Sequence, residues 1–168
     1  MKIQKMTICA LFIAMCFIGA NIKFVGSIAL DAAPALIGTL LLGPVYGMAL
    51  GFFGHIISSL LAGFPLSFPV HIIVAVMMAL TMVSYSISRK WLEKKFNRMA
   101  AIIGSGIVMF LFNCPLSLLA LYPLLQKMVW ALFPALAAAT LCNLVIAELL
   151  YAALPVKWRQ KYQSARTM

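Results

Sequence analysis

Long apolar runs, separated by short polar or turn-rich segments, dominate the chain. The interruptions are a basic head at 1–5, a mixed segment at 21–31, a turn-rich segment at 63–69, and basic segments at 89–98 and 155–168. A helix needs roughly 20 apolar residues to cross a hydrocarbon core of about 30 Å. The spacing of the runs therefore predicts an all-α, polytopic bundle of membrane-spanning helices.

The apolar stretch at 32–62 is too long for one span and short for two. Gly43-Pro44 divides it, because proline cannot continue the helical hydrogen-bond ladder and clashes with the preceding turn. The chain then forms one domain, 1–168, with a short second helix. The predicted spans are 6–20, 32–42, 45–61, 70–88, 100–121 and one within 127–154.

The basic residues support six crossings. With the N-terminus in the cytoplasm, every Lys and Arg except Lys23 and Lys127 lies on the cytoplasmic side. If 32–62 crossed only once, the 89–98 cluster and the N-terminus would lie on opposite sides. The excess of positive charge that cytoplasmic segments normally carry would then largely vanish. The sequence therefore predicts that both termini are cytoplasmic.

Composition excludes several classes of function. Hydrophobic residues make up 65% of the chain and charged residues 10%, whereas about a quarter of a soluble domain is charged. The net charge of +10 belongs to the flanks of the spans, so no nucleic-acid partner is expected. The four cysteines lie inside apolar runs without a CxxC pair, so neither disulfides nor metal binding is expected.

Polar side chains inside the apolar runs are the candidates for ligand binding, because such groups are costly in lipid. Asp31 can contact a ligand in an outward-facing pocket or cap the second helix, and both interpretations stay open. His55 and Ser59 are four residues apart and share one face of the third span. His71 opens the fourth span. Both histidines can bond a ligand or a neighbouring helix, and neither has a carboxylate or cysteine at metal-ligand spacing.

Three more polar residues lie within predicted spans. Asn113 stands beside Pro115, where an interrupted helix can line a cavity. Asn143 lies in the middle of the last span. Glu148 lies deeper and can serve as a coupling or proton site or pair with a basic residue at a helix end, and we favour the pairing.

Small residues four apart, as at Ala10 and Ala14, let another helix approach closely. A chain that combines this alanine pair with six spans, a basic middle segment and a basic tail resembles the substrate-binding S components of energy-coupling factor (ECF) vitamin transporters. Three segments resemble the branch assigned to α-ribazole, a cobalamin precursor. They are DAAPALIGTLLLGPVYG starting at Asp31, GFFGH ending at His55, and GFPLSFPVH ending at His71.

The resemblance implies a bacterial plasma-membrane protein that binds its vitamin in a pocket near the outer face. It docks on an ECF module of one transmembrane coupling protein and two ATPase subunits, and ATP hydrolysis drives its reorientation. Ala10 and Ala14 would contact the coupling protein, and 21–30 and 63–69 would be gating loops. With the aromatic residues as stacking partners, the substrate-binding candidates are Asp31, His55, Ser59, Phe64, Phe68, His71, Asn113 and Tyr122.

Other functions remain as alternatives. The ligand can be another vitamin, such as pantothenate, a pyridoxine-like compound or a queuosine precursor. A structural subunit without ligand is disfavoured by the intramembrane Asp31, His55 and His71. A small membrane enzyme is disfavoured because the chain has only three acidic residues and they are not clustered. Neither a cofactor nor an enzymatic activity is expected.

Overall fold

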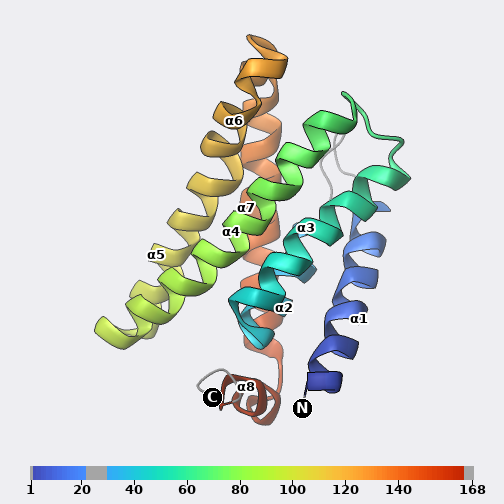
Figure 1. The fold of residues 1–168 in the computed structure, drawn as a ribbon. Coiled ribbons are helices and arrows are strands. Elements are labelled where there is room, and N and C mark those ends of the chain that lie inside the picture. The colour runs from blue at the N-terminus through green and yellow to red at the C-terminus, as the bar shows by residue number, and fades with distance from the viewer. Residues whose placement is uncertain (1, 22–29, 165–168) are drawn as a thin grey trace.

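The computed structural model describes residues 2–21 and 30–164, and every regular element among them is a helix (Figure 1). The elements are α1 (Lys2–Asn21), α2 (Ala32–Leu42), α3 (Pro44–Leu61), α4 (Phe68–Lys95), α5 (Arg98–Leu111), the π-helical η1 (Phe112–Leu116), α6 (Ser117–Leu125), α7 (Met128–Ala153) and α8 (Val156–Ser164).

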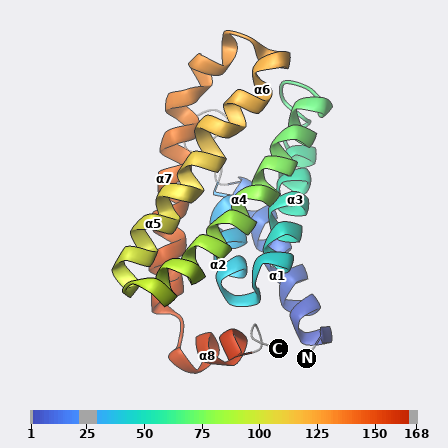
Figure 2. The same cartoon turned by 60° about the vertical axis from the view of Figure 1, so that its left-hand side comes forward.

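Five described segments are long and apolar enough to cross a membrane: α1, α3, α4, the continuous α5–η1–α6 stretch, and α7. The apolar α2 is shorter. The prediction of a polytopic helix bundle with a short second helix is therefore confirmed. The start of α1 and the tail helix α8 lie at the same end of the bundle (Figures 1 and 2), which agrees with an even number of chain passages.

The short α2 is enclosed by protein. All of its residues are buried, and it packs against α1, α3 and α7. Gly43 links it to α3 with φ 99°, a left-handed conformation that glycine adopts without steric cost. Pro44 begins α3, where its missing N–H leaves no hydrogen bond unmade. This tight reversal explains why one long apolar stretch forms two helices.

The basic segment 89–98 is mostly helical, which corrects the predicted end of the fourth span at residue 88. α4 continues to Lys95, because the Lys, Leu and Glu residues of this segment are strong helix formers. After a short turn, α5 begins at Arg98. The side chain of Asn97 caps α5 by accepting a hydrogen bond of 2.8 Å from the backbone N–H of Ala100.

Pro115 interrupts the fifth span without ending it. The five residues of η1 form a wider π-helical turn around this proline, which cannot donate a backbone hydrogen bond. The hydroxyl of Ser117 donates to the carbonyl of Phe112 across the turn (2.9 Å). Asn113 is buried in this segment. The helix thus turns a polar side chain inward at the point where its regular pattern breaks.

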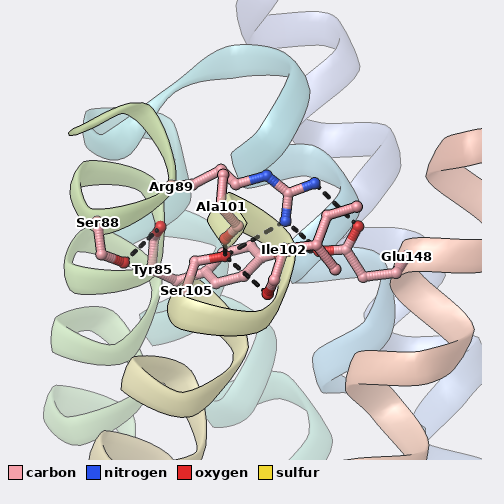
Figure 3. A network of polar contacts seen from close by, with 7 residues as sticks. All are labelled: Tyr85, Ser88, Arg89, Ala101, Ile102, Ser105 and Glu148. Atoms are coloured by element: carbon pink, nitrogen blue, oxygen red, sulfur yellow. Dashed lines mark hydrogen bonds and ion pairs between the residues drawn. The ribbon is translucent and has the colours of Figure 1, made fainter. Parts of the chain in front are cut away.

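A buried polar network joins α4, α5 and α7 in the half of the bundle nearer the chain ends (Figure 3). The guanidinium of Arg89 donates to both carboxylate oxygens of Glu148, at 2.5 and 3.1 Å, and to the hydroxyl of Ser105 at 3.3 Å. The hydroxyl of Tyr85 donates to Glu148 at 2.6 Å. The favoured pairing of Glu148 with a basic residue is confirmed.

Candidate substrate-binding site

A cavity of about 470 Å³ lies among α2, α3, α4, α6 and α7. Pro65 and Leu66, in the turn between α3 and α4, line it, and this turn lies at the end of the bundle remote from α8 (Figure 2). Small-molecule sites enclose roughly 300–1,000 Å³. Its wall is divided between polar and aliphatic side chains. The polar residues are Asp31, His55, Ser58, Ser59, His71, Asn113, Ser117, Thr140 and Asn143, and the larger aliphatic residues are Val70, Val74, Met78, Leu118, Leu121, Leu132 and Leu136.

The structure brings together five of the eight residues that the sequence singles out for substrate binding. Asp31 lies at the start of α2, His55 and Ser59 on α3, His71 on α4 and Asn113 in η1, and all five line this cavity. Four separate segments of the chain therefore contribute polar groups to one enclosed space.

The three predicted aromatic partners lie outside the cavity wall. Phe68 is 54% exposed at the first turn of α4, whereas His71, almost one turn later, faces inward. Tyr122 is 47% exposed because it points about 100° away from the buried Leu121. Phe64 packs edge-on against Phe68, with 5.1 Å between ring centroids. No Phe, Tyr or Trp is present among the described lining residues.

A line of polar groups crosses one side of the cavity. Nδ1 of His55 lies 3.7 Å from Oδ2 of Asp31, and Nε2 of His55 lies 3.2 Å from Nδ1 of His71. Nε2 of His71 in turn lies 2.5 Å from the carbonyl oxygen of Pro65. The line therefore runs from the start of α2, through α3 and α4, to the turn between α3 and α4.

The Pro65 carbonyl sets the direction of these hydrogen bonds. A carbonyl only accepts, so Nε2 of His71 carries a hydrogen, and Nδ1 of a neutral His71 is an acceptor. Nε2 of His55 then donates to His71. The hydroxyl of Ser59 adds a contact of 2.9 Å to Nδ1 of His71 and donates to the backbone of its own helix. Both imidazoles are thus oriented by protein groups, and the Asp31 carboxylate ends the line.

Asn143 performs the capping that one interpretation of the sequence assigned to Asp31. The side chain of Asp31 makes no capping hydrogen bond to α2. Instead, Oδ1 of Asn143, on α7, accepts a hydrogen bond of 2.8 Å from the backbone N–H of Ala33. Nδ2 of Asn143 donates to the carbonyl of Ala139 (2.9 Å), which orients the amide. The capping interpretation of Asp31 is therefore wrong, and its carboxylate faces His55.

Sequence reasoning did not assign four polar cavity residues to the site, namely Ser58, Ser117, Thr140 and Asn143. Nδ2 of Asn113 donates to the hydroxyl of Thr140 at 2.8 Å, and this hydroxyl donates to Leu136 within α7. A signal was present in the sequence, because Thr140 and Asn143 are three apart and share a helix face. Their partners on η1 and α2 are too distant in the chain to be inferred.

The turn between α3 and α4, one of the two predicted gating segments, forms part of the cavity wall through Pro65 and Leu66. The backbone N–H of Phe64 donates to the carbonyl of Ser59 (2.8 Å), and His71 holds the Pro65 carbonyl. Two cavity residues thus anchor this turn. The other predicted gating segment, 21–30, falls largely outside the described residues, with only its first and last positions included.

The exposed side of α1 carries the predicted partner residues. Ala10 and Ala14 are both exposed, whereas Cys9, Phe12 and Cys16 are buried against the bundle. The contacts of α1 are with α2 and α3. The two alanines therefore form a shallow strip on the surface that another helix can approach.

The family model described as the substrate-specific component of ECF transporters matches residues 4–155. The chain therefore belongs to this family of multi-pass membrane proteins. Its members are transport subunits that bind a small molecule and associate with an ECF module, rather than enzymes. No curated protein and no solved structure matches the chain.

Proposed function

We propose that this chain is the α-ribazole-binding subunit of an ECF transporter, and that the cavity among α2, α3, α4, α6 and α7 holds the ligand. The observation that carries the proposal is that the cavity wall combines aliphatic side chains with hydrogen-bonding groups and one carboxylate. α-Ribazole joins an apolar aromatic base to a hydroxyl-rich ribose, so its two halves suit these two kinds of side chain.

The aliphatic wall suits a flat, apolar base. Side chains of α4, α6 and α7, including Val74, Leu118 and Leu136, supply this surface. Removing an aromatic base from water into such a wall is favourable by roughly 25 cal/mol for each Å² of apolar surface buried. The imidazoles of His55 and His71, whose ring centroids are 5.4 Å apart, also line the cavity and are flat groups that can contact a ring face.

The polar wall suits hydroxyl groups better than an anion. A ribose hydroxyl can donate to the Asp31 carboxylate and exchange hydrogen bonds with Asn113 or Ser117. Among the described lining residues there is no Lys or Arg. A carboxylate such as that of pantothenate would therefore face Asp31 without a lysine or arginine to pair with. Pyridoxine-like compounds and queuosine precursors remain the alternative ligands.

The first test is mass spectrometry of small molecules that co-purify with the detergent-solubilised protein, followed by calorimetric titration with α-ribazole, pantothenate, pyridoxine and a queuosine precursor. We expect stoichiometric, tight binding of α-ribazole. Asp31→Asn should weaken it by about 10- to 100-fold, since a hydrogen bond to a charged group contributes about 1.5–3 kcal/mol.

Two control variants separate the cavity from the rest of the protein. Glu93→Gln removes a carboxylate that does not line the cavity, and Tyr122→Leu removes an aromatic ring outside it. Both should bind α-ribazole as the unmodified protein does. Tight binding of another vitamin would contradict α-ribazole as the substrate but would agree with a transport function. Absence of any bound small molecule would contradict the assignment of the cavity.

A further inference from the structure

A second pocket, of about 300 Å³, lies at the opposite end of the bundle from the substrate cavity. The tail helix α8 lies across this end (Figure 2), and the pocket is bounded by α8 and the ends of α2, α4, α5 and α7. Its charged lining residues are Arg89, Lys90, Glu93, Arg98 and Arg159. Four cations and one carboxylate therefore share a small space that the transport function does not explain.

The lining of this pocket carries excess positive charge even when the ion pair between Arg89 and Glu148 is left out of the count. Arg89 is neutralised by Glu148. Arg98 and Arg159 then face Glu93 as the single acidic group of the described lining. A concave site with excess positive charge attracts an anion, and guanidinium groups bind phosphate oxygens with two parallel hydrogen bonds.

Arg159 supplies an independent observation that points to an absent acceptor. Its guanidinium lies over the ring of Tyr151, with 5.8 Å from Cζ to the ring centroid. The Nε atom is buried and has no hydrogen-bond partner among the described residues. A buried donor without an acceptor costs about 1–3 kcal/mol, so such an atom is normally bonded to something. The stacked guanidinium therefore has a donor that no described residue pairs, at a residue that lines the pocket.

Exposed aromatic residues indicate the depth of this pocket in the membrane. Trp91, Phe96 and Trp158 are exposed on α4, on the turn after it and on α8. Nζ of Lys95 lies 4.9 Å from the ring centroid of Trp91. Tryptophan beside basic residues is typical of the boundary between hydrocarbon and headgroups, and a short helix that combines them typically lies in that plane.

We propose that this pocket binds the phosphate of an anionic phospholipid headgroup. Basic pockets between helix ends on the cytoplasmic side recognise such headgroups. A lipid fits better than inorganic phosphate, because Leu40 and Val156 add apolar surface to the wall. The bound headgroup connects α8 to α4 and α5 and fixes the tail helix against the bundle.

The test is native mass spectrometry of the detergent-solubilised full chain, titrated with dioleoyl-phosphatidylglycerol or with dioleoyl-phosphatidylcholine. We expect one retained phosphatidylglycerol, with a Kd at least fivefold below that of phosphatidylcholine. A fivefold ratio is about what one basic residue near an anionic lipid surface contributes to affinity. Excess inorganic phosphate should not displace the lipid. Equal affinity for the two lipids, or displacement by phosphate, would overturn the proposal.

Variants of α8 distinguish a site from general attraction. Arg159→Gln should raise the Kd for phosphatidylglycerol about fivefold, and Arg159→Lys should restore part of the loss. Lys157→Gln makes the same charge change on the same helix at a residue that does not line the pocket, and it should bind as the unmodified protein does. The exposed Arg98→Gln repeats the test without disturbing α8. Equal weakening by Lys157→Gln and Arg159→Gln would contradict a defined site.

Discussion

Arg89 on α4 and Glu148 on α7 form a two-fold hydrogen-bonded ion pair inside the bundle (Figure 3). Their side chains are 7% and 16% exposed. An isolated charge at this depth is costly, but two paired charges with further bonds from Tyr85 and Ser105 are tolerated. Neither residue of the pair lines the candidate cavity among α2, α3, α4, α6 and α7, so its role in stability can be tested separately from ligand binding.

Glu148→Gln should lower the free energy of unfolding by about 3–5 kcal/mol, because it leaves the Arg89 guanidinium buried without its counter-charge. The measurement is thermal unfolding of the detergent-solubilised protein. The double variant Arg89→Met/Glu148→Met should unfold at a higher temperature than Glu148→Gln, since it removes both charges. Glu93→Gln, at an exposed carboxylate, is the control. Unfolding of Glu148→Gln at the unmodified temperature would contradict the role of the pair.

Asn143→Ala should weaken ligand binding as well as stability. The amide of Asn143 holds the first turn of α2 through Ala33, next to Asp31 in the cavity wall. Leaving that buried N–H without a partner costs about 1–3 kcal/mol. Asn97→Ala removes a comparable cap from α5, far from the cavity, and should lower stability by about 1 kcal/mol while ligand affinity stays unchanged. If both variants bind ligand equally well, the cap does not position Asp31.

Gly51→Ala should destabilise the contact between α3 and α4. A Cβ at Gly51 would lie 2.6 Å from the carbonyl oxygen of Met78, a backbone atom that cannot move alone. Overpacking of this kind costs about 1–3 kcal/mol, and the shift of Met78 should also reshape the cavity. Gly106→Ala meets only the flexible end of Leu144 at 3.0 Å, so it should be nearly neutral. Thermal unfolding and ligand titration of the two variants make the comparison, and an equal effect would contradict the close approach.

Ala14→Trp should abolish uptake in cells that express the complete transporter, while ligand binding by the purified protein is retained. Its bulk would block the surface strip that Ala10 and Ala14 form on α1. Met15→Trp places the same side chain at an exposed position about 100° around the helix from Ala14 and should reduce uptake less. Normal uptake by Ala14→Trp would show that the ECF module docks elsewhere.

Several features of the fold follow from local physical chemistry, and the sequence was sufficient to predict them. The length of each apolar run determines whether a helix can span lipid. Gly43-Pro44 breaks the helix whatever packs around it. The interruption of the fifth span around Pro115 is likewise a local consequence of proline. These features depend on neighbouring residues in the chain, so they could be found without knowledge of packing.

The facing of side chains was decided by the tertiary structure. In spans that are apolar on all sides, hydrophobic periodicity does not show which face is buried, because lipid and protein interior are both apolar. The exposure of Tyr122 and the cap from Asn143 to Ala33, across 110 residues, therefore cannot be predicted from the sequence alone. The amino-acid sequence by itself determined that the chain forms a bundle of apolar helices, with breaks at Gly43-Pro44 and Pro115. Only the rotation and packing of those helices decided which polar groups share the cavity, because that depends on contacts between segments far apart in the chain.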